Sequence, residues 1–106
     1  MPNISNIFVD NFCGSQLFID IMQDCGENAG GLYCRIYDKS RFIMDGTDKE
    51  QYPVPIDFGD YLDDFCIRPT DCSMKYSDII SYILKYVQVN ISENDLQVSR
   101  KKDLAR

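Results

Sequence analysis

Apolar and polar residues alternate along this chain with two different periods, one typical of helices and one of strands. The clearest signal predicts a helix over 78–88, with Ser77 as its N-cap and Asp78 in its first turn. Within it, apolar residues recur at helical spacing and form one broad stripe, namely Ile79, Ile80, Ile83, Leu84 and Val87. We therefore expect this helix to be the main core element.

In the first quarter of the chain, the pattern of apolar residues predicts a strand and then a segment that fits either a helix or a strand. The apolar run 4–9 predicts a first strand. A helix over 16–25 is favoured by Ser15, a good N-cap residue, and by Gly26, a good residue to end a helix. The same stretch also fits the period of a strand, through Leu17, Ile19 and Ile21.

The middle of the chain predicts extended structure. A glycine-rich loop, 26–31, precedes a hairpin over 32–44. Two sets of hairpin side chains are expected on opposite faces: Leu32, Cys34 and Ile36, and Tyr33, Arg35 and Tyr37. A charged turn, 46–51, then leads into an extended segment, 52–56, whose two prolines indicate an edge strand or a loop.

The stretch IDFGDYLDDFC, residues 56–66, interleaves acidic and apolar residues. At about 100° per residue its carboxylates fill one arc of a helix and its apolar side chains the other. This spacing predicts a helix over 58–66, although Gly59 would weaken it. The outward-facing acids would be Asp57, Asp60, Asp63 and Asp64.

The last segment, 92–106, has two interpretations. Ser92 and Asp95 resemble a capping box at the start of a helix, whereas Leu96 and Val98 alternate as in a short strand. Residues 99–106 are predicted to form a frayed basic tail. Together the elements predict one compact α+β domain over 1–106, with a small, mainly antiparallel sheet packed against two or three helices.

Composition excludes several classes of function. The formal net charge of −6 argues against binding to nucleic acid or to an anionic membrane. The chain has no histidine, so the commonest general base and metal ligand are missing, and we expect no enzyme, no cofactor and no metal site. The five cysteines lack the close pairs of zinc sites, and no secretory signal is visible, which indicates reduced thiols and a cytoplasmic protein.

The distribution of charge leaves many carboxylates without a nearby cation. No lysine or arginine occurs from Glu50 to Ile67, so the acids of 56–66 have no helical partner at i,i+4. Just upstream, Asp45 and Asp48 add charge of the same sign. Two interpretations stay open: the solvated face of an amphipathic helix, or an acidic patch that binds a basic protein.

In size, acidity and stretches such as IDFGDYLDDF, the chain resembles the small acidic immunity proteins that bacteria pair with nuclease toxins, including those of contact-dependent growth inhibition. The resemblance implies an inhibitor that covers the active site or substrate cleft of a basic toxin, with the oligomeric state open. The expected contact residues are Asp57, Asp60, Tyr61, Asp63, Asp64, Asp45, Asp48 and Glu50.

Two other functions remain as alternatives. The first is a small adaptor or host-modulating protein with a tyrosine-rich interface, either at Tyr82 and Tyr86 or on the hairpin face. The second is a hydrolase without histidine, which would need a deep pocket and a carboxylate with a raised pKa.

Overall fold

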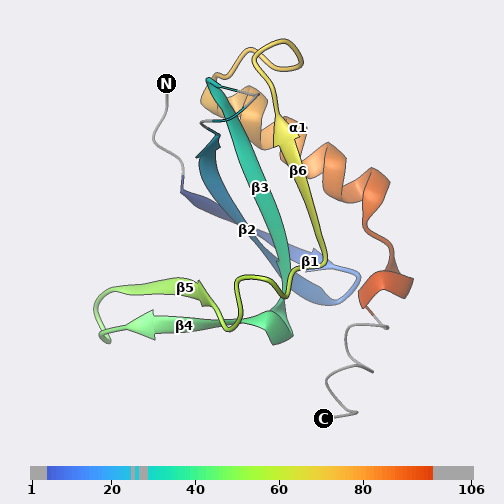
Figure 1. Ribbon diagram of the computed structural model, residues 1–106. Coiled ribbons are helices and arrows are strands. Elements are labelled where there is room, and N and C mark those ends of the chain that lie inside the picture. The colour runs from blue at the N-terminus through green and yellow to red at the C-terminus, as the bar shows by residue number, and fades with distance from the viewer. Residues whose placement is uncertain (1–4, 25, 27–28, 97–106) are drawn as a thin grey trace.

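The chain folds into a four-stranded sheet, a separate two-stranded sheet and one long helix (Figure 1). The computed structural model describes residues 5–24, 26 and 29–96. The strands are β1 (Asn6–Phe12), β2 (Ser15–Asp24), β3 (Gly31–Asp38), β4 (Phe42–Gly46), β5 (Gln51–Pro55) and β6 (Asp63–Ile67). The helices are the short 3-10 helix η1 (Lys39–Arg41) and α1 (Tyr76–Asn90). This arrangement confirms the predicted α+β class with an antiparallel sheet.

The larger sheet has the strand order β1-β2-β3-β6, and every neighbouring pair is antiparallel. The register sets Ile19 of β2 beside Ile7 of β1 and Ile36 of β3. Because side chains alternate between the two faces of a strand, this register gathers the apolar residues of three strands on one face.

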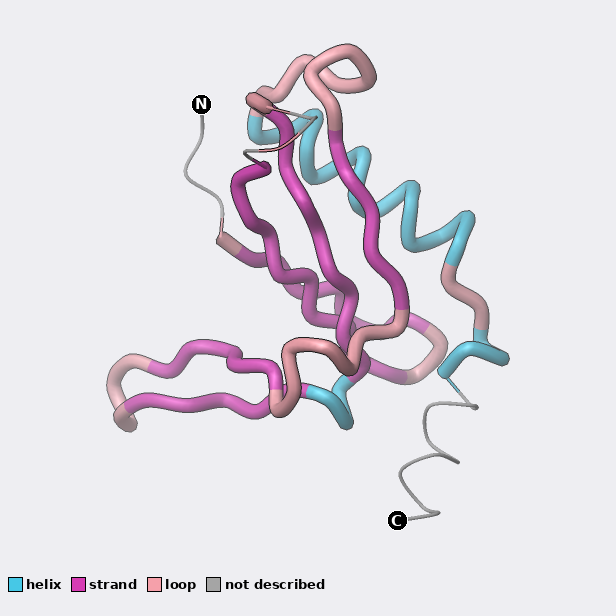
Figure 2. The backbone as a smooth tube through the Cα atoms, viewed as in Figure 1, coloured by secondary structure: helices cyan, strands magenta, loops and turns pink. Residues whose placement is uncertain are grey.

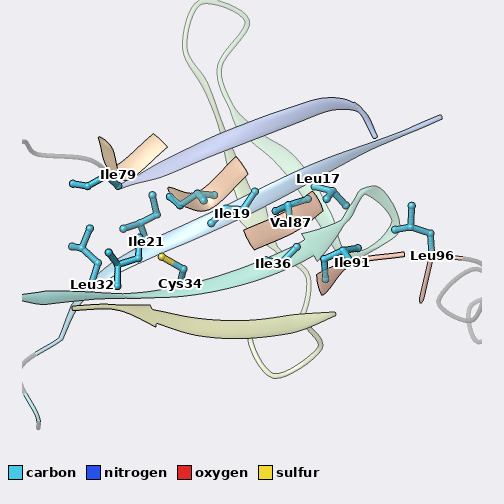
Figure 3. Close-up of a cluster of buried hydrophobic side chains, with 12 residues drawn as sticks. Leu17, Ile19, Ile21, Leu32, Cys34, Ile36, Ile79, Val87, Ile91 and Leu96 are labelled. Carbon is cyan, nitrogen blue, oxygen red and sulfur yellow. The ribbon is translucent and has the colours of Figure 1, made fainter. Parts of the chain in front are cut away.

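Helix α1 covers that apolar face and forms the main core with it (Figure 3). From the helix, Ile79, Ile83 and Val87 are buried against the sheet. The sheet contributes residues that are at most 5% exposed, among them Leu17, Ile19, Ile21, Leu32, Cys34, Ile36 and Ile67. Burying each large aliphatic side chain stabilises the fold by about 1.5–3 kcal/mol, so this interface is the main source of stability.

The predicted helix over 78–88 is confirmed, but its start differs from the expectation. The N-cap residue is Lys75, not Ser77, and it makes no side-chain capping bond. The predicted stripe is also narrower than expected, because Leu84 is 39% exposed.

Of the two interpretations of the segment after this helix, the capping box is the one that the structure shows at Ser92 and Asp95. The backbone N–H of Ser92 donates to the Asp95 carboxylate at 2.8 Å, and the N–H of Asp95 donates to Ser92 Oγ at 3.3 Å. A short helical segment, 93–96, follows and buries Leu96. Val98 and the predicted basic tail, 99–106, lie outside the described residues.

The predicted helix over 16–25 is wrong, because this segment is the central strand β2. It hydrogen-bonds to β1 on one side and to β3 on the other. The segment instead follows the strand period that Leu17, Ile19 and Ile21 also fit. As a strand it buries these three side chains on one face and Phe18 on the other.

The predicted hairpin over 32–44 is also wrong. Strand β3 pairs with β2 and β6, whereas β4 pairs with β5. The chain turns away from the larger sheet after Asp38, whose carboxylate accepts hydrogen bonds from Lys39 N at 2.7 Å and from Ser40 Oγ at 3.2 Å. This buried carboxylate caps η1 and directs β4 away from the sheet.

The second face of the larger sheet carries an aromatic cluster at one end. Phe18, Tyr37 and Phe42 are buried there, and Phe8 and Tyr61 pack against them. The ring centres of Phe18 and Phe42 are 5.3 Å apart. Because Phe42 is the first residue of β4, this cluster anchors the base of the two-stranded sheet.

Beyond that base, β4 and β5 form a hairpin that projects from the four-stranded sheet (Figure 2). We call residues 42–55 the arm. The predicted turn at 46–51 and the predicted extended segment at 52–56 are confirmed as the tip and the second strand of this arm. No helix within the described part of the chain is long and apolar enough to cross a membrane.

Candidate functional site

The stretch 56–66, which carries five of the eight expected contact residues, does not form the predicted helix. Residues 56–62 are an irregular loop, and β6 begins at Asp63. The helix prediction is wrong because β6 completes the edge of the larger sheet beside β3, a tertiary contact that outweighs the helical spacing. The four aspartates therefore lie in separate places and not on one face.

The first two aspartates belong to the 56–62 loop. Asp57 is exposed and accepts a hydrogen bond from the N–H of Gly59 at 2.9 Å, which closes a local turn. Asp60 forms an ion pair with Arg41, a residue that is only 6% exposed. For Asp60 the expectation of an uncompensated charge is thus wrong, since this pair fastens the loop to the base of the arm.

The other two aspartates lie on opposite faces of β6. On the helix face, Asp63 accepts a hydrogen bond from the Tyr86 hydroxyl at 2.8 Å. On the other face, Asp64 accepts one from the Tyr33 hydroxyl at 2.6 Å. Adjacent strand residues point to opposite faces, so no single partner surface could cover both carboxylates.

Tyr61 contributes to a cluster around Arg35 on the face opposite α1. The Arg35 guanidinium carbon lies 5.1 Å from the centre of the Tyr61 ring and 5.2 Å from that of Tyr33. Arg35 Nη1 also donates to the Phe58 carbonyl at 3.2 Å. In this position Tyr61 supports the loop as an intramolecular cation–π partner and is only partly accessible.

The same cluster changes the ionisation of its members. Burial raises the pKa of Tyr33 to about 12. Burial also raises the pKa of Asp20, against the opposing effect of the Arg35 charge in the neighbouring strand. These groups are already engaged with one another, and we assign them the structural role of holding the strands and the loop together.

The remaining expected residues, Asp45, Asp48 and Glu50, all lie at the tip of the arm. All three are exposed, and Lys49 is the only cation of the arm. The arm therefore carries three carboxylates against one lysine. Of the eight expected contact residues, the structure brings these three together on a projecting element and leaves Asp57 exposed near its base.

Local backbone chemistry explains why the arm folds as it does. Thr47 and Glu50 exchange two backbone hydrogen bonds, of 3.0 and 3.2 Å, across the turn. Gly46 has a φ of +114°, and a Cβ at this position would overlap the carbonyl oxygen of Glu50. Glycine is thus required at the point where β4 enters the turn.

The arm and the adjoining loop also expose large apolar side chains, which the sequence did not identify as contact residues. Their exposed fractions are between 46% and 61% for Ile43, Met44, Tyr52, Ile56 and Phe58. Ile43 and Met44 belong to the predicted hairpin over 32–44, but in the structure their strand pairs with β5 in the arm. Apolar groups beside carboxylates on a projecting hairpin are suited to contact with another protein.

The described residues contain no group of three or more acidic or cysteine side chains placed to hold a metal ion. Among them, Cys13, Cys34 and Cys72 are free thiols. Searches of protein-family models, curated proteins and solved structures found no match to this chain.

Proposed function

We propose that this protein is an inhibitor of the immunity-protein type, which neutralises a basic protein toxin, specifically a nuclease, by placing its acidic arm in the substrate cleft. Its role is binding, without catalysis or cofactor, and its place of action is the bacterial cytoplasm. The observation that carries this proposal is the arm itself: Asp45, Asp48 and Glu50 at the tip, with exposed apolar side chains behind them.

The chemistry of a nuclease explains why such an arm would suit it. A nuclease binds a polyanion, so its substrate cleft is lined with lysine and arginine. Carboxylates at the end of a thin hairpin can enter that cleft in place of phosphates. Opposite charges increase the rate of encounter, and desolvated apolar anchors such as Tyr52 slow dissociation.

The proposed contact surface consists of the arm tip, the exposed apolar residues and Asp57. The remaining expected residues, Asp60, Tyr61, Asp63 and Asp64, act as supports. Asp60 has the clearest of these roles, because its ion pair with Arg41 holds the 56–62 loop against the base of the arm. A base held in this way keeps the tip in a fixed direction and so lowers the entropy lost on binding.

Capture from the source cell tests this function. The tagged protein should co-purify with a basic protein whose nuclease activity the purified inhibitor suppresses. In the variant Asp45→Lys/Asp48→Lys, affinity should fall by about tenfold or more, and the difference should shrink at high salt.

The matched control is Asp10→Lys/Glu93→Lys, which makes the same change in net charge at two exposed acids outside the arm. This control should retain most of the affinity. Equal losses in both variants would show that only the total charge matters, and an unchanged affinity in the tip variant would remove the arm from the interface.

The alternative function, a small adaptor, would use the side of α1 next to β6, where Tyr82 and Tyr86 are partly exposed. Both tyrosine rings stack on Phe65: the ring centre of Tyr82 lies 6.3 Å from that of Phe65, and the ring centre of Tyr86 lies 3.9 Å from it. Together with Val89, the two tyrosines line a groove of about 370 Å³. Val89 is 72% exposed. Val89→Asp should abolish partner binding by an adaptor of this kind and leave toxin inhibition through the arm unchanged.

A further inference from the structure

We propose that the outer edge of β4 pairs, as an added antiparallel strand, with an extended basic segment of the partner protein. This inference rests on the proposed function and specifies how the arm would hold its target. The contact would be made by main-chain hydrogen bonds centred on Met44, with side-chain contacts on both sides.

The hydrogen-bond register of the arm determines which backbone groups point outward. The N–H of Ile56 donates to the carbonyl of Arg41 at 2.9 Å, and Thr47 and Glu50 bond to each other. Hydrogen-bonded and non-hydrogen-bonded pairs alternate in an antiparallel ladder. The pair of Met44 with Pro53 is therefore a non-hydrogen-bonded one, and its backbone groups face away from the hairpin.

The two edges of the arm consequently differ. On β5, Pro53 and Pro55 occupy outward positions, and proline has no N–H, so the outward donor that this edge keeps is that of Gln51, beside the turn. On β4, Met44 directs both its N–H and its carbonyl outward, whereas the N–H of Gly46 is already bonded to the Asp45 carboxylate at 2.8 Å. Within the arm, the middle of the β4 edge therefore offers a backbone donor and acceptor together, whereas the middle of the β5 edge, at Pro53, offers no donor.

The side chains along this edge define the chemistry of that strand. Ile43 is 54% exposed on one face of the arm and Met44 is 46% exposed on the other. Toward the tip the edge becomes acidic, with Asp45 followed by Asp48. A complementary antiparallel segment would therefore place lysine or arginine first, opposite the tip, and apolar residues after them, opposite Ile43 and Met44.

The charge of the chain favours a basic partner segment, and not a second copy of this chain, as the added strand. Two arms paired edge to edge would bring together chains that each carry a net charge of −6, and both arms have a surplus of carboxylates. A basic segment gains electrostatic attraction along the same edge.

The test uses a synthetic peptide in which lysines and arginines precede a run of valine and threonine. We expect this peptide to slow exchange of the Met44 amide hydrogen in the full chain. Met44→Pro removes the outward donor without breaking a hydrogen bond of the arm, and it should weaken peptide binding by about tenfold. Met44→Leu keeps the donor and should bind like the parent protein.

A peptide of the same sequence with N-methylated backbone nitrogens separates pairing from charge. It should bind at least about tenfold more weakly. Equal binding of both peptides, no binding of either, or equal affinity of Met44→Pro and Met44→Leu would overturn the strand-pairing proposal. So would sedimentation showing a dimer of the parent protein that Met44→Pro dissociates, since the occupant would then be a second copy. None of these results would decide the toxin proposal, which is tested separately by the capture experiment and the tip variants.

Discussion

At the scale of single residues, this protein uses tyrosine hydroxyls as partners for carboxylates. Tyr86 binds Asp63 across the interface of α1 with β6, and Tyr33 binds Asp64 on the other face of the sheet. Burial, and next the hydrogen bond to Asp63, raise the pKa of Tyr86 from 10.0 to about 12. The folded protein therefore holds the Tyr86 proton at a pH where the unfolded chain has lost it.

This shift predicts a loss of stability in alkali. Between about pH 10 and pH 12 the unfolded state binds fewer protons than the folded state, so the free energy of unfolding falls as the pH rises through this window. Below pH 10 this contribution is fully present. Tyr86→Phe should flatten the fall, as measured by urea unfolding at a series of pH values. Tyr76→Phe, at a tyrosine that is 58% exposed, should keep the parent slope, and equal slopes for all three proteins would refute the assignment.

At the scale of elements, the arm and the four-stranded sheet have different sources of stability. Among the described residues, the main core cluster contains no residue of the arm, and a two-stranded hairpin is marginally stable in water without support. The arm relies on Phe42 in the aromatic cluster, on the Arg41–Asp60 ion pair and on its own turn. We expect it to open locally more readily than the sheet.

Gly46→Ala tests this difference between the elements. Alanine at a φ of +114° is strained and would overlap the Glu50 carbonyl, so the turn should be destabilised by more than about 1 kcal/mol. Hydrogen exchange should accelerate at the amide of Asp45 and stay slow in β2. In the control Gly59→Ala, the added Cβ meets only the Asp57 carboxylate, at 3.5 Å. This variant should change neither the exchange of the Asp45 amide nor that of β2. A loss of protection in β2 would mean that the arm and the sheet unfold together.

At the scale of the whole molecule, a body and a projecting arm are combined in one chain. The body consists of the larger sheet and α1, whose interface holds most of the buried apolar residues. The exposed residues of the arm contribute little to that core, yet they carry the proposed contact with another protein. Stability and binding should therefore be separable.

Shortening the arm tests this separation. Ile43 and Val54 form a hydrogen-bonded pair in the register described above, so an Asn-Gly type I′ turn can join them in place of residues 44–53. The shortened protein should melt within a few degrees of the parent, because its main core is intact, and it should no longer bind the toxin. A much lower melting temperature in calorimetry would show that the arm stabilises the body after all.

The alternation of single residues was often sufficient to predict local structure. The helix over 78–88 followed from apolar residues at helical spacing, and the turn at 46–51 from its polar composition. The alternation over 32–37 also predicted that Cys34 and Arg35 lie on opposite faces, and in the structure Cys34 is on the buried face. These signals are local, and each arises from the geometry of one element.

The wrong predictions of secondary structure concern segments that fit both the helical and the strand period, or segments whose strand partner could not be read from the sequence. Residues 16–25 and 58–66 each fit a helix, but both contain strands, because backbone pairing with β1 or β3 and burial on the sheet outweigh local preference. For the candidate site, the acids of the arm tip, which the sequence offered as contact residues, are exposed in the structure. The ion pair of Asp60 was missed, since Arg41 lies 19 positions earlier in the chain.

The sequence by itself therefore determined the α+β class, the long helix and the surplus of carboxylates, because these depend on composition and on the period of short segments. Only the tertiary structure decided that β4 leaves the larger sheet, which acids find internal partners and which remain on a projecting arm. The physical reason is that strand pairing and ion pairing join residues distant in sequence, and no local pattern records which of the possible partners they meet.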